Sequence, residues 1–177
     1  MGVGTGNIQA SSLELDLWIA AVGRGDRDAL EKLYRATSSA VYAYALSILQ
    51  NYHDAEDILH DSFVSIWRCA GDYRSQGKPM AWIMTVTRNL CLKLLQQQRR
   101  QVRLDDAMPP QVAQENPEES LMLRQCMQSL TDEERQIVVL YAVAGCKHRH
   151  IAQLMGLKLS TELSKYHRAI QKIRASF

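Results

Sequence analysis

Apolar residues along this chain recur with a period close to 3.6 residues, the period of an amphipathic α-helix. No window shows the sustained apolar–polar alternation that a half-buried β-strand requires. In the first hundred residues the pattern predicts four helices: one that ends near residues 23–25, one over 26–50, one over 54–68 and one over 79–98. The sequence therefore predicts an all-α fold.

Residues that begin or end helices stand where the periodic segments meet. Ser11 and Glu14 have the spacing of a capping box, and Asp26 is suited to cap the second helix. Residues 51–53 interrupt the pattern, and Pro79 fits the first turn of the fourth helix. These positions predict short connections between neighbouring helices.

The prolines divide the chain into two helical parts. Residues 101–118 are acidic and contain Pro109, Pro110 and Pro117, so we expect a flexible linker there. The glycine-rich residues 1–12 are expected to be disordered. We therefore predict two small helical domains, residues 13–100 and residues 119–177, joined by that linker.

The second domain ends in a basic helix-turn-helix. A helical segment over residues 147–155 stops at Gly156, and another begins near Ser160, its expected cap, and runs to about Arg174. This layout can place the last helix in a DNA major groove, whereas an isolated basic helix is more often a solvated surface. The residues expected to contact duplex DNA are Lys158, Ser160, Thr161, Ser164, Lys165, Arg168 and Lys172.

The helix over 79–98 combines an aromatic residue, an amide and cations on one stripe. Such a mixture suits single-stranded DNA, whose bases stack on rings while its phosphates meet cations. The alternative is that Trp82 is an ordinary core residue. With the loop before this helix, the candidate set is Tyr73, Arg74, Lys78, Trp82, Thr85, Arg88, Asn89 and Lys93.

The helix over 54–68 carries acids along one side and apolar residues along the other. By itself, the stripe of Asp54, Asp57, Asp61 and Val64 is typical of a solvated face with acids near the helix N-terminus. No second acidic cluster with metal-ligand spacing accompanies it, so we predict neither a metal site nor a catalytic site there.

The composition and the distribution of charge favour some classes of function over others. The net charge of the 177 residues is only +2, but residues 1–100 are nearly balanced while the last third is basic, which favours nucleic-acid contact by that part. The four cysteines are scattered, and no membrane-spanning run, secretory leader, nucleophile motif or phosphate loop stands out. We expect a cytoplasmic binding protein without cofactor, metal or catalytic residues.

Several segments resemble a known family. GDRDALEKLYR, DAEDILHDSFVSIWR and AWIMTVTRNLCLKLL resemble, in order, the second conserved region of extracytoplasmic-function sigma factors. LTDEERQIVVLYAVAGCKHRHIAQLMGL, followed by STELSKYHRAIQKIR, resembles their fourth region. The resemblance extends from about Leu13 to Arg174 and preserves the spacing within each block.

This resemblance implies a two-domain protein that gives RNA polymerase its promoter specificity. The Asp54–Val64 face would dock on the clamp helices of the largest catalytic core subunit, and the fourth region on the flap of the second large subunit. The set from Tyr73 to Lys93 would read and help melt the −10 element, and the last helix would read the −35 element. An anti-sigma protein commonly controls such factors.

Two departures from the family lie within the helix-turn-helix. Glu162 and Leu163 stand where the family usually has an apolar residue followed by a cation, and His148 and His150 stand where an aromatic and an acid are frequent. Two other functions stay open: a helix-turn-helix regulator that binds duplex operator DNA with an N-terminal helical sensor, and a helical adaptor that binds only protein.

Overall fold

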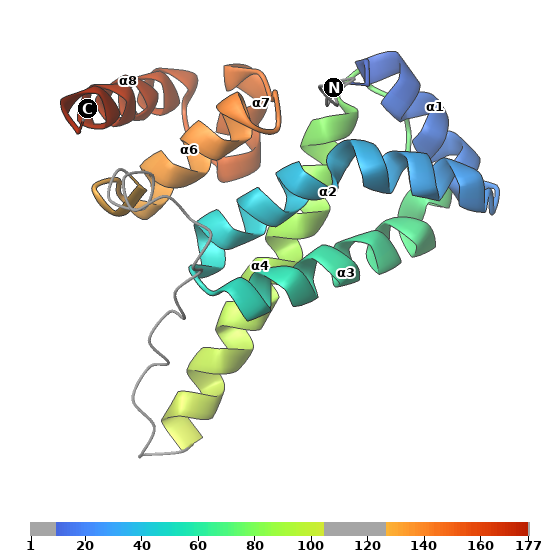
Figure 1. The fold of residues 1–177 in the computed structure, drawn as a ribbon, viewed down its shortest axis with the longest axis horizontal. Helices are drawn as coiled ribbons and strands as arrows, with labels where there is room; N and C mark the ends of the chain where they lie inside the picture. The colour runs from blue at the N-terminus through green and yellow to red at the C-terminus, as the bar shows by residue number, and fades with distance from the viewer. Residues whose placement is uncertain (1–9, 105–126, 177) are drawn as a thin grey trace, which may run out of the picture.

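The computed structural model describes residues 10–104 and 127–176, and within these ranges all regular structure is helical. The first part contains α1 (Ser12–Gly23), α2 (Arg27–Leu49), α3 (Tyr52–Cys69), the short 3₁₀ turn η1 (Ala70–Asp72) and α4 (Pro79–Leu104). The second part contains α6 (Asp132–Ala142), α7 (His148–Met155) and α8 (Leu159–Ala175). The predicted all-α fold is confirmed (Figure 1).

Side-chain caps begin the first helices where the sequence predicted them. Ser11 and Glu14 form a reciprocal capping box on α1, and the Asp26 side chain accepts a hydrogen bond from the backbone of Ala29. The start of α3 was predicted two residues too late, because the Asn51 side chain accepts from the Asp54 amide and lets the helix begin at Tyr52.

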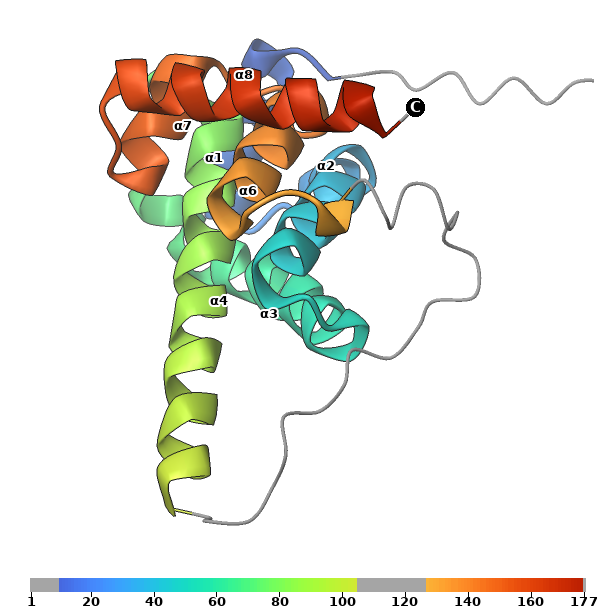
Figure 2. The same ribbon diagram turned by 90° about the vertical axis from the view of Figure 1, so that its left-hand side faces the viewer.

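The fourth helix is longer than predicted. α4 runs to Leu104, so the first four residues of the predicted linker are helical; they include no proline or glycine to stop the helix. In Figure 2 the C-terminal part of α4 extends past the other helices. The predicted disorder of residues 1–9 and the rest of the linker lie outside the described residues, whereas Ala10 to Ser12 are described and lead into the α1 cap.

The core of the first part is built around α2. This helix packs against α1, α3 and α4, and its side chains Leu33, Val41 and Tyr44 are fully buried. They meet Ile66 of α3 and Ile83 of α4, which are also fully buried. Burying each such aliphatic side chain contributes roughly 1.5–3 kcal/mol, so this core holds η1 and the start of α4 in place.

The helix-turn-helix forms as predicted except at one boundary. α7 ends at Gly156, whose φ of 67° is the left-handed conformation that glycine adopts without strain. α8 begins at Leu159, with Lys158 rather than Ser160 as its N-cap residue, and no side-chain hydrogen bond caps it. Figure 2 shows α8 lying across α6 and α7, which it contacts.

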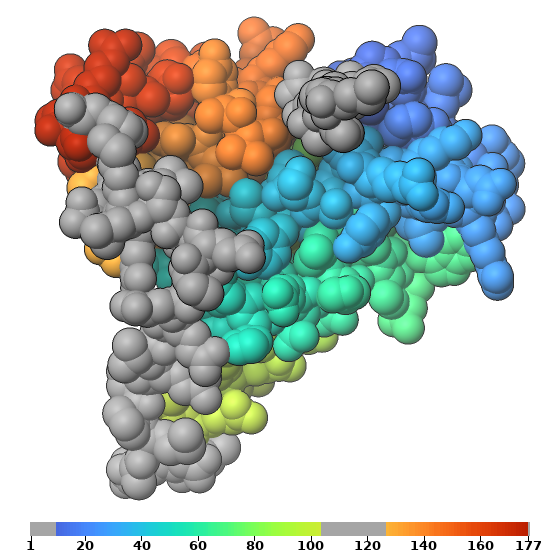
Figure 3. Space-filling model, viewed as in Figure 1, coloured from blue at the N-terminus to red at the C-terminus, as the bar shows by residue number. Residues whose placement is uncertain are grey.

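The two parts pack against each other through α2 and α6. Ile137 and Leu140 of α6 are fully buried in the same apolar cluster as the α2 side chains. The buried Arg135 donates to the carbonyls of Ser47, Leu130 and Met127, and the Gln50 side chain donates to Asp132 at 3.1 Å. In the space-filling view the atoms of α6 lie directly beside those of α2 (Figure 3).

Candidate nucleic-acid and polymerase interfaces

The outer face of α8 presents hydroxyls and cations to solvent. Of the predicted duplex-binding residues, Lys158, Ser160, Thr161, Ser164 and Arg168 are exposed. His167 and Gln171 are exposed on the same helix and were missed by the sequence prediction. Their spacing of three and seven residues from Ser164 was the available signal, because such positions share a helix face.

Lys165 and Lys172 are not on this open face. The Lys165 ammonium lies 2.6 Å from a carboxylate oxygen of Glu133, and the Lys172 ammonium lies 2.7 Å from one of Glu134, both in the first turn of α6. Burial alone would raise the pKa of Glu134, but hydrogen bonds from Lys172 and Thr131 outweigh it and hold the pKa below its usual range. The two lysines therefore face α6, and their contact with DNA stays a prediction.

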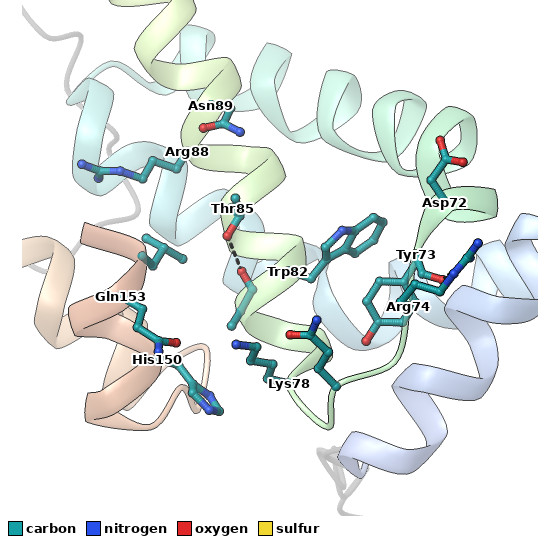
Figure 4. Close-up of a pocket in the computed structure, with 13 residues that line it drawn as sticks. Asp72, Tyr73, Arg74, Lys78, Trp82, Thr85, Arg88, Asn89, His150 and Gln153 are labelled. Atoms are coloured by element: carbon teal, nitrogen blue, oxygen red, sulfur yellow. Dashed lines mark hydrogen bonds between the residues drawn. The ribbon is translucent and has the colours of Figure 1, made fainter. Parts of the chain in front are cut away.

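A groove of about 530 Å³ lies between the first part and α7 (Figure 4). Seven of the eight residues predicted to read melted DNA line it: Tyr73, Arg74, Lys78, Trp82, Thr85, Arg88 and Asn89. The opposite side is formed by His150, Gln153 and Leu154 of α7. Lys93 is exposed farther along α4 and does not line the groove.

Two aromatic rings in contact form one wall of this groove. The rings of Tyr73 and Trp82 are 4.7 Å apart and tilted by 54°, and both side chains are half-buried. The Tyr73 hydroxyl donates to Asp16 of α1, and burial together with that carboxylate raises the pKa of Tyr73. Tyr73 thus anchors the loop to α1, and Trp82, which is half-buried, packs against the core and also lines the groove.

Arg88 in the groove forms hydrogen bonds to both parts of the protein, and the surroundings shift the pKa of two neighbouring groups. The Arg88 guanidinium donates to the Gln136 side chain of α6 at 2.8 Å and to the Tyr44 hydroxyl at 3.4 Å. Burial raises the pKa of Tyr44 to about 12 despite the Arg88 charge. Burial and the charges of Lys78, Lys147 and Arg149 lower the pKa of His150.

The acidic stripe of α3 lies largely on the surface. Asp57 and Asp61 are exposed, Val64 is 48% exposed, and Asp54 is half-buried and accepts a hydrogen bond from Gln98 at 2.9 Å. Trp67 is 36% exposed one turn beyond Val64. The stripe therefore ends in an apolar patch, a combination suited to a protein partner.

Neither a metal site nor a transmembrane helix emerges from residues 10–104 and 127–176. These ranges contain no group of three metal-ligating side chains. They also include no helix with the length and apolar character that a bilayer crossing demands.

A helix-turn-helix with exposed hydroxyls and cations, together with a groove of rings, amide and cations, is typical of a DNA-binding protein. The sequence matches two family descriptions, "Sigma-70 region 2" over residues 33–101 and "Sigma-70, region 4" over residues 120–173. The chain belongs to the sigma-70 family, in its extracytoplasmic-function class.

Individual relatives agree with this assignment. The RNA polymerase sigma factor CarQ of Myxococcus xanthus is 30% identical over 156 residues, which cover 85% of this chain and 90% of CarQ. The extracytoplasmic-function sigma factor SigK of Mycobacterium ulcerans is 24% identical, with 91% of this chain and 92% of SigK covered.

Solved structures confirm the fold. RpoE of Bartonella quintana, crystallised with the anti-sigma factor NepR, superposes with a TM-score of 0.69 at 21% identity, covering 82% of this chain and 94% of RpoE. CnrH, in complex with the cytosolic domain of CnrY, gives a TM-score of 0.64 at 20% identity, covering 92% and 96%.

The protein is thus an RNA polymerase sigma factor, which binds core polymerase and promoter DNA and directs transcription initiation without catalysing a reaction itself. Neither the operator-binding regulator nor the protein-only adaptor finds support in these matches.

Proposed function

We propose that the two parts of the protein divide promoter recognition between them. The outer face of α8 binds the −35 element as duplex, and the groove formed by residues 72–78 and α4 binds the −10 element as it melts. The observation that carries this proposal is the groove itself, where the Tyr73–Trp82 ring pair lies among Arg74, Lys78 and Asn89. Rings for bases and cations for phosphates are what single-stranded DNA requires.

The acidic stripe of α3 is the proposed docking surface for core polymerase. Asp57, Asp61 and Val64 are exposed together on the face away from the α2 core, and a solvated helix does not need the exposed Val64 and Trp67 beside them. This surface contacts the clamp helices of the largest catalytic subunit, while the second part contacts the flap of the second large subunit and the linker follows the RNA exit channel.

Two further proposals concern control and place of action. An anti-sigma protein holds this factor inactive; the support is that the similar folds of RpoE and CnrH were solved with NepR and CnrY bound. The factor works in the cytoplasm, where RNA polymerase and the chromosome are.

One experiment separates DNA melting from polymerase docking. We expect Asn89→Ala, which changes an exposed side chain, to preserve holoenzyme assembly but to suppress promoter opening, because losing a side-chain contact to a base costs about 1–3 kcal/mol. Permanganate reactivity of unpaired thymines measures the opening. Asp57→Lys with Asp61→Lys should instead abolish assembly without affecting the fold, since exposed charge changes cost less than about 0.5 kcal/mol.

The matched control is Asp28→Lys with Glu31→Lys, which makes the same charge change on exposed positions of α2. It should assemble and open promoters normally. Wild-type thymine reactivity in Asn89→Ala would refute the assignment of the groove, and wild-type core affinity in the α3 double variant would refute the docking surface.

A further inference from the structure

The recognition helix carries a carboxylate in its buried face. Glu162 is 0% exposed and sits in the first turn of α8. Its Oε1 lies 2.9 Å from Nδ1 of His148, the first residue of α7. Its Oε2 is also buried, and within the described residues no hydrogen-bond donor reaches it. A buried carboxylate therefore depends on a single histidine contact.

Aromatic rings from all three helices of the second part surround this contact. The His148 ring stacks on Tyr141 of α6 with 4.4 Å between centroids and an interplanar angle of 15°. Its edge meets Tyr166 of α8 at 4.8 Å, and the two tyrosine rings are 4.9 Å apart. The Glu162–His148 contact thus joins α7 to α8 while the rings connect both to α6.

Stability alone does not account for this arrangement. Burying a carboxylate is unfavourable unless it is paired and hydrogen-bonded, and a well-packed apolar pair is often at least as stable as a buried charged pair. What a buried hydrogen bond adds is direction, because it forms in one relative placement of its two helices whereas apolar side chains can pack in several.

The local backbone leaves that placement open. Only residues 156–158 separate α7 from α8, and α8 begins without a side-chain cap. The backbone amide of Leu157 is tied to the carbonyl of Ala152 at 2.8 Å, which fixes the end of α7 but not the rotation of the next helix. Beyond this turn, the placement of α8 depends on its packing against α6 and α7, and Glu162–His148 is the buried hydrogen bond in its contact with α7.

We propose that Glu162 and His148 are a positioning pair that sets the rotation of α8 about its axis and thereby determines which side chains meet the bases of the −35 element. This inference rests on the proposed role of α8 in duplex recognition. Glu162 occupies the first turn, next to Ser160, Thr161 and Ser164. A small rotation of α8 there would move all three hydroxyls relative to the base edges in the DNA major groove.

The test compares an apolar replacement with a conservative one in the full chain assembled with core polymerase. The double variant His148→Phe with Glu162→Leu keeps a buried, packed contact but lacks the directional hydrogen bond. Glu162→Gln keeps a carbonyl oxygen that can accept from Nδ1. Each holoenzyme selects binding sites from promoter DNA with a randomised −35 element, and thermal unfolding of each variant is measured alongside.

We expect the apolar double variant to unfold at or above the wild-type temperature while its discrimination at one or more −35 positions falls about tenfold, the loss of one base contact. Glu162→Gln should select the wild-type sequence. An apolar variant that is as stable as the wild type and selects the same −35 sequence with the same discrimination would overturn the proposal.

A measurement on the unaltered protein covers the case in which the double variant does not fold. Nitrogen NMR of the His148 ring should show a hydrogen-bonded Nδ1, and rapid exchange of Nδ1 with solvent would overturn the pairing. The companion variant Arg168→Ala tests separately whether α8 binds the −35 element. If Arg168→Ala leaves the upstream footprint unchanged, the assignment of α8 to the −35 element is wrong. If the footprint changes but the double variant selects the wild-type −35 sequence, the positioning pair alone is rejected.

Discussion

In the free protein, the positive charges of two lysines of α8 are paired with carboxylates of α6. Glu133 and Glu134 begin α6, where their negative charge also suits the positive end of the helix dipole, and they hold Lys165 and Lys172. Each pair lowers the positive charge that the second part presents to phosphate. Nonspecific attraction to DNA is therefore weaker than the number of cations on α8 indicates.

Releasing one of these lysines should strengthen DNA binding. Glu133→Gln removes the partner of Lys165, so we expect severalfold tighter binding to nonspecific duplex and a salt dependence steeper by about one counterion. Fluorescence anisotropy across a salt series measures both. Glu31→Gln, which releases Arg35 from a comparable pair on α2, is the matched control and should change neither. An unchanged salt slope in Glu133→Gln would indicate that Lys165 does not approach phosphate.

At the scale of the elements, the end of α1 fits closely against η1. A Cβ added to Gly23 would lie 2.7 Å from the carbonyl oxygen of Ala70, a contact with backbone that no rotamer change relieves. η1 leads directly to Tyr73 and the groove, so this close approach fixes where the loop before α4 begins. The position demands glycine for its small size, since its φ is not in the left-handed range.

We expect Gly23→Ala to lower the free energy of unfolding by about 1–3 kcal/mol, because α1 must move away from η1. Urea denaturation measures the change. Gly71→Ala is the control on the other side of the contact: its Cβ would lie 3.7 Å from the nearest atom, an ordinary distance, so its cost should stay below about 1 kcal/mol. Equal stability of the two variants would mean that the helix end yields without cost.

Helix boundaries could be predicted from the sequence, whereas contacts between distant residues could not. Ser11, Asp26, Pro79 and Gly156 mark helix ends through local chemistry, and the structure confirms each of them. The contacts of Gln136 and Gln50 could not be predicted, because their partners lie 48 and 82 residues away. The sequence shows Glu162 where the family usually has an apolar residue, but its partner His148 depends on how α7 meets α8.

At the scale of the whole molecule, the two proposed DNA-binding surfaces lie on parts that pack against each other. Residues of both parts line a single groove, and Arg88 is bonded to Gln136. Promoter elements centred near −35 and −10 are separated by about 25 base pairs, or roughly 85 Å of B-DNA at 3.4 Å per base pair. For both proposed surfaces to act on one promoter, we expect the α2–α6 contact to open first.

Opening should be measurable as a change in distance. Labels at the exposed Lys32 of α2 and Gln171 of α8 should report a short separation in the free protein and a much longer one with core polymerase and promoter DNA. Gln136→Ala should shift the free protein toward the longer distance, because it removes the acceptor of Arg88. A separation that stays constant on holoenzyme formation would show that the packed arrangement is the active one.

The hydrogen bond between Arg88 and Gln136 has a consequence for apparent affinity. A ligand that binds only the open form can bind only the fraction of molecules that are open. Its apparent dissociation constant therefore equals the intrinsic dissociation constant divided by that fraction. With about 1% open, promoter DNA would bind roughly a hundredfold more weakly than its contacts alone allow. On this proposal, the second part acts as a tethered competitor at the groove, which dilution does not remove and which a partner that favours the open form displaces.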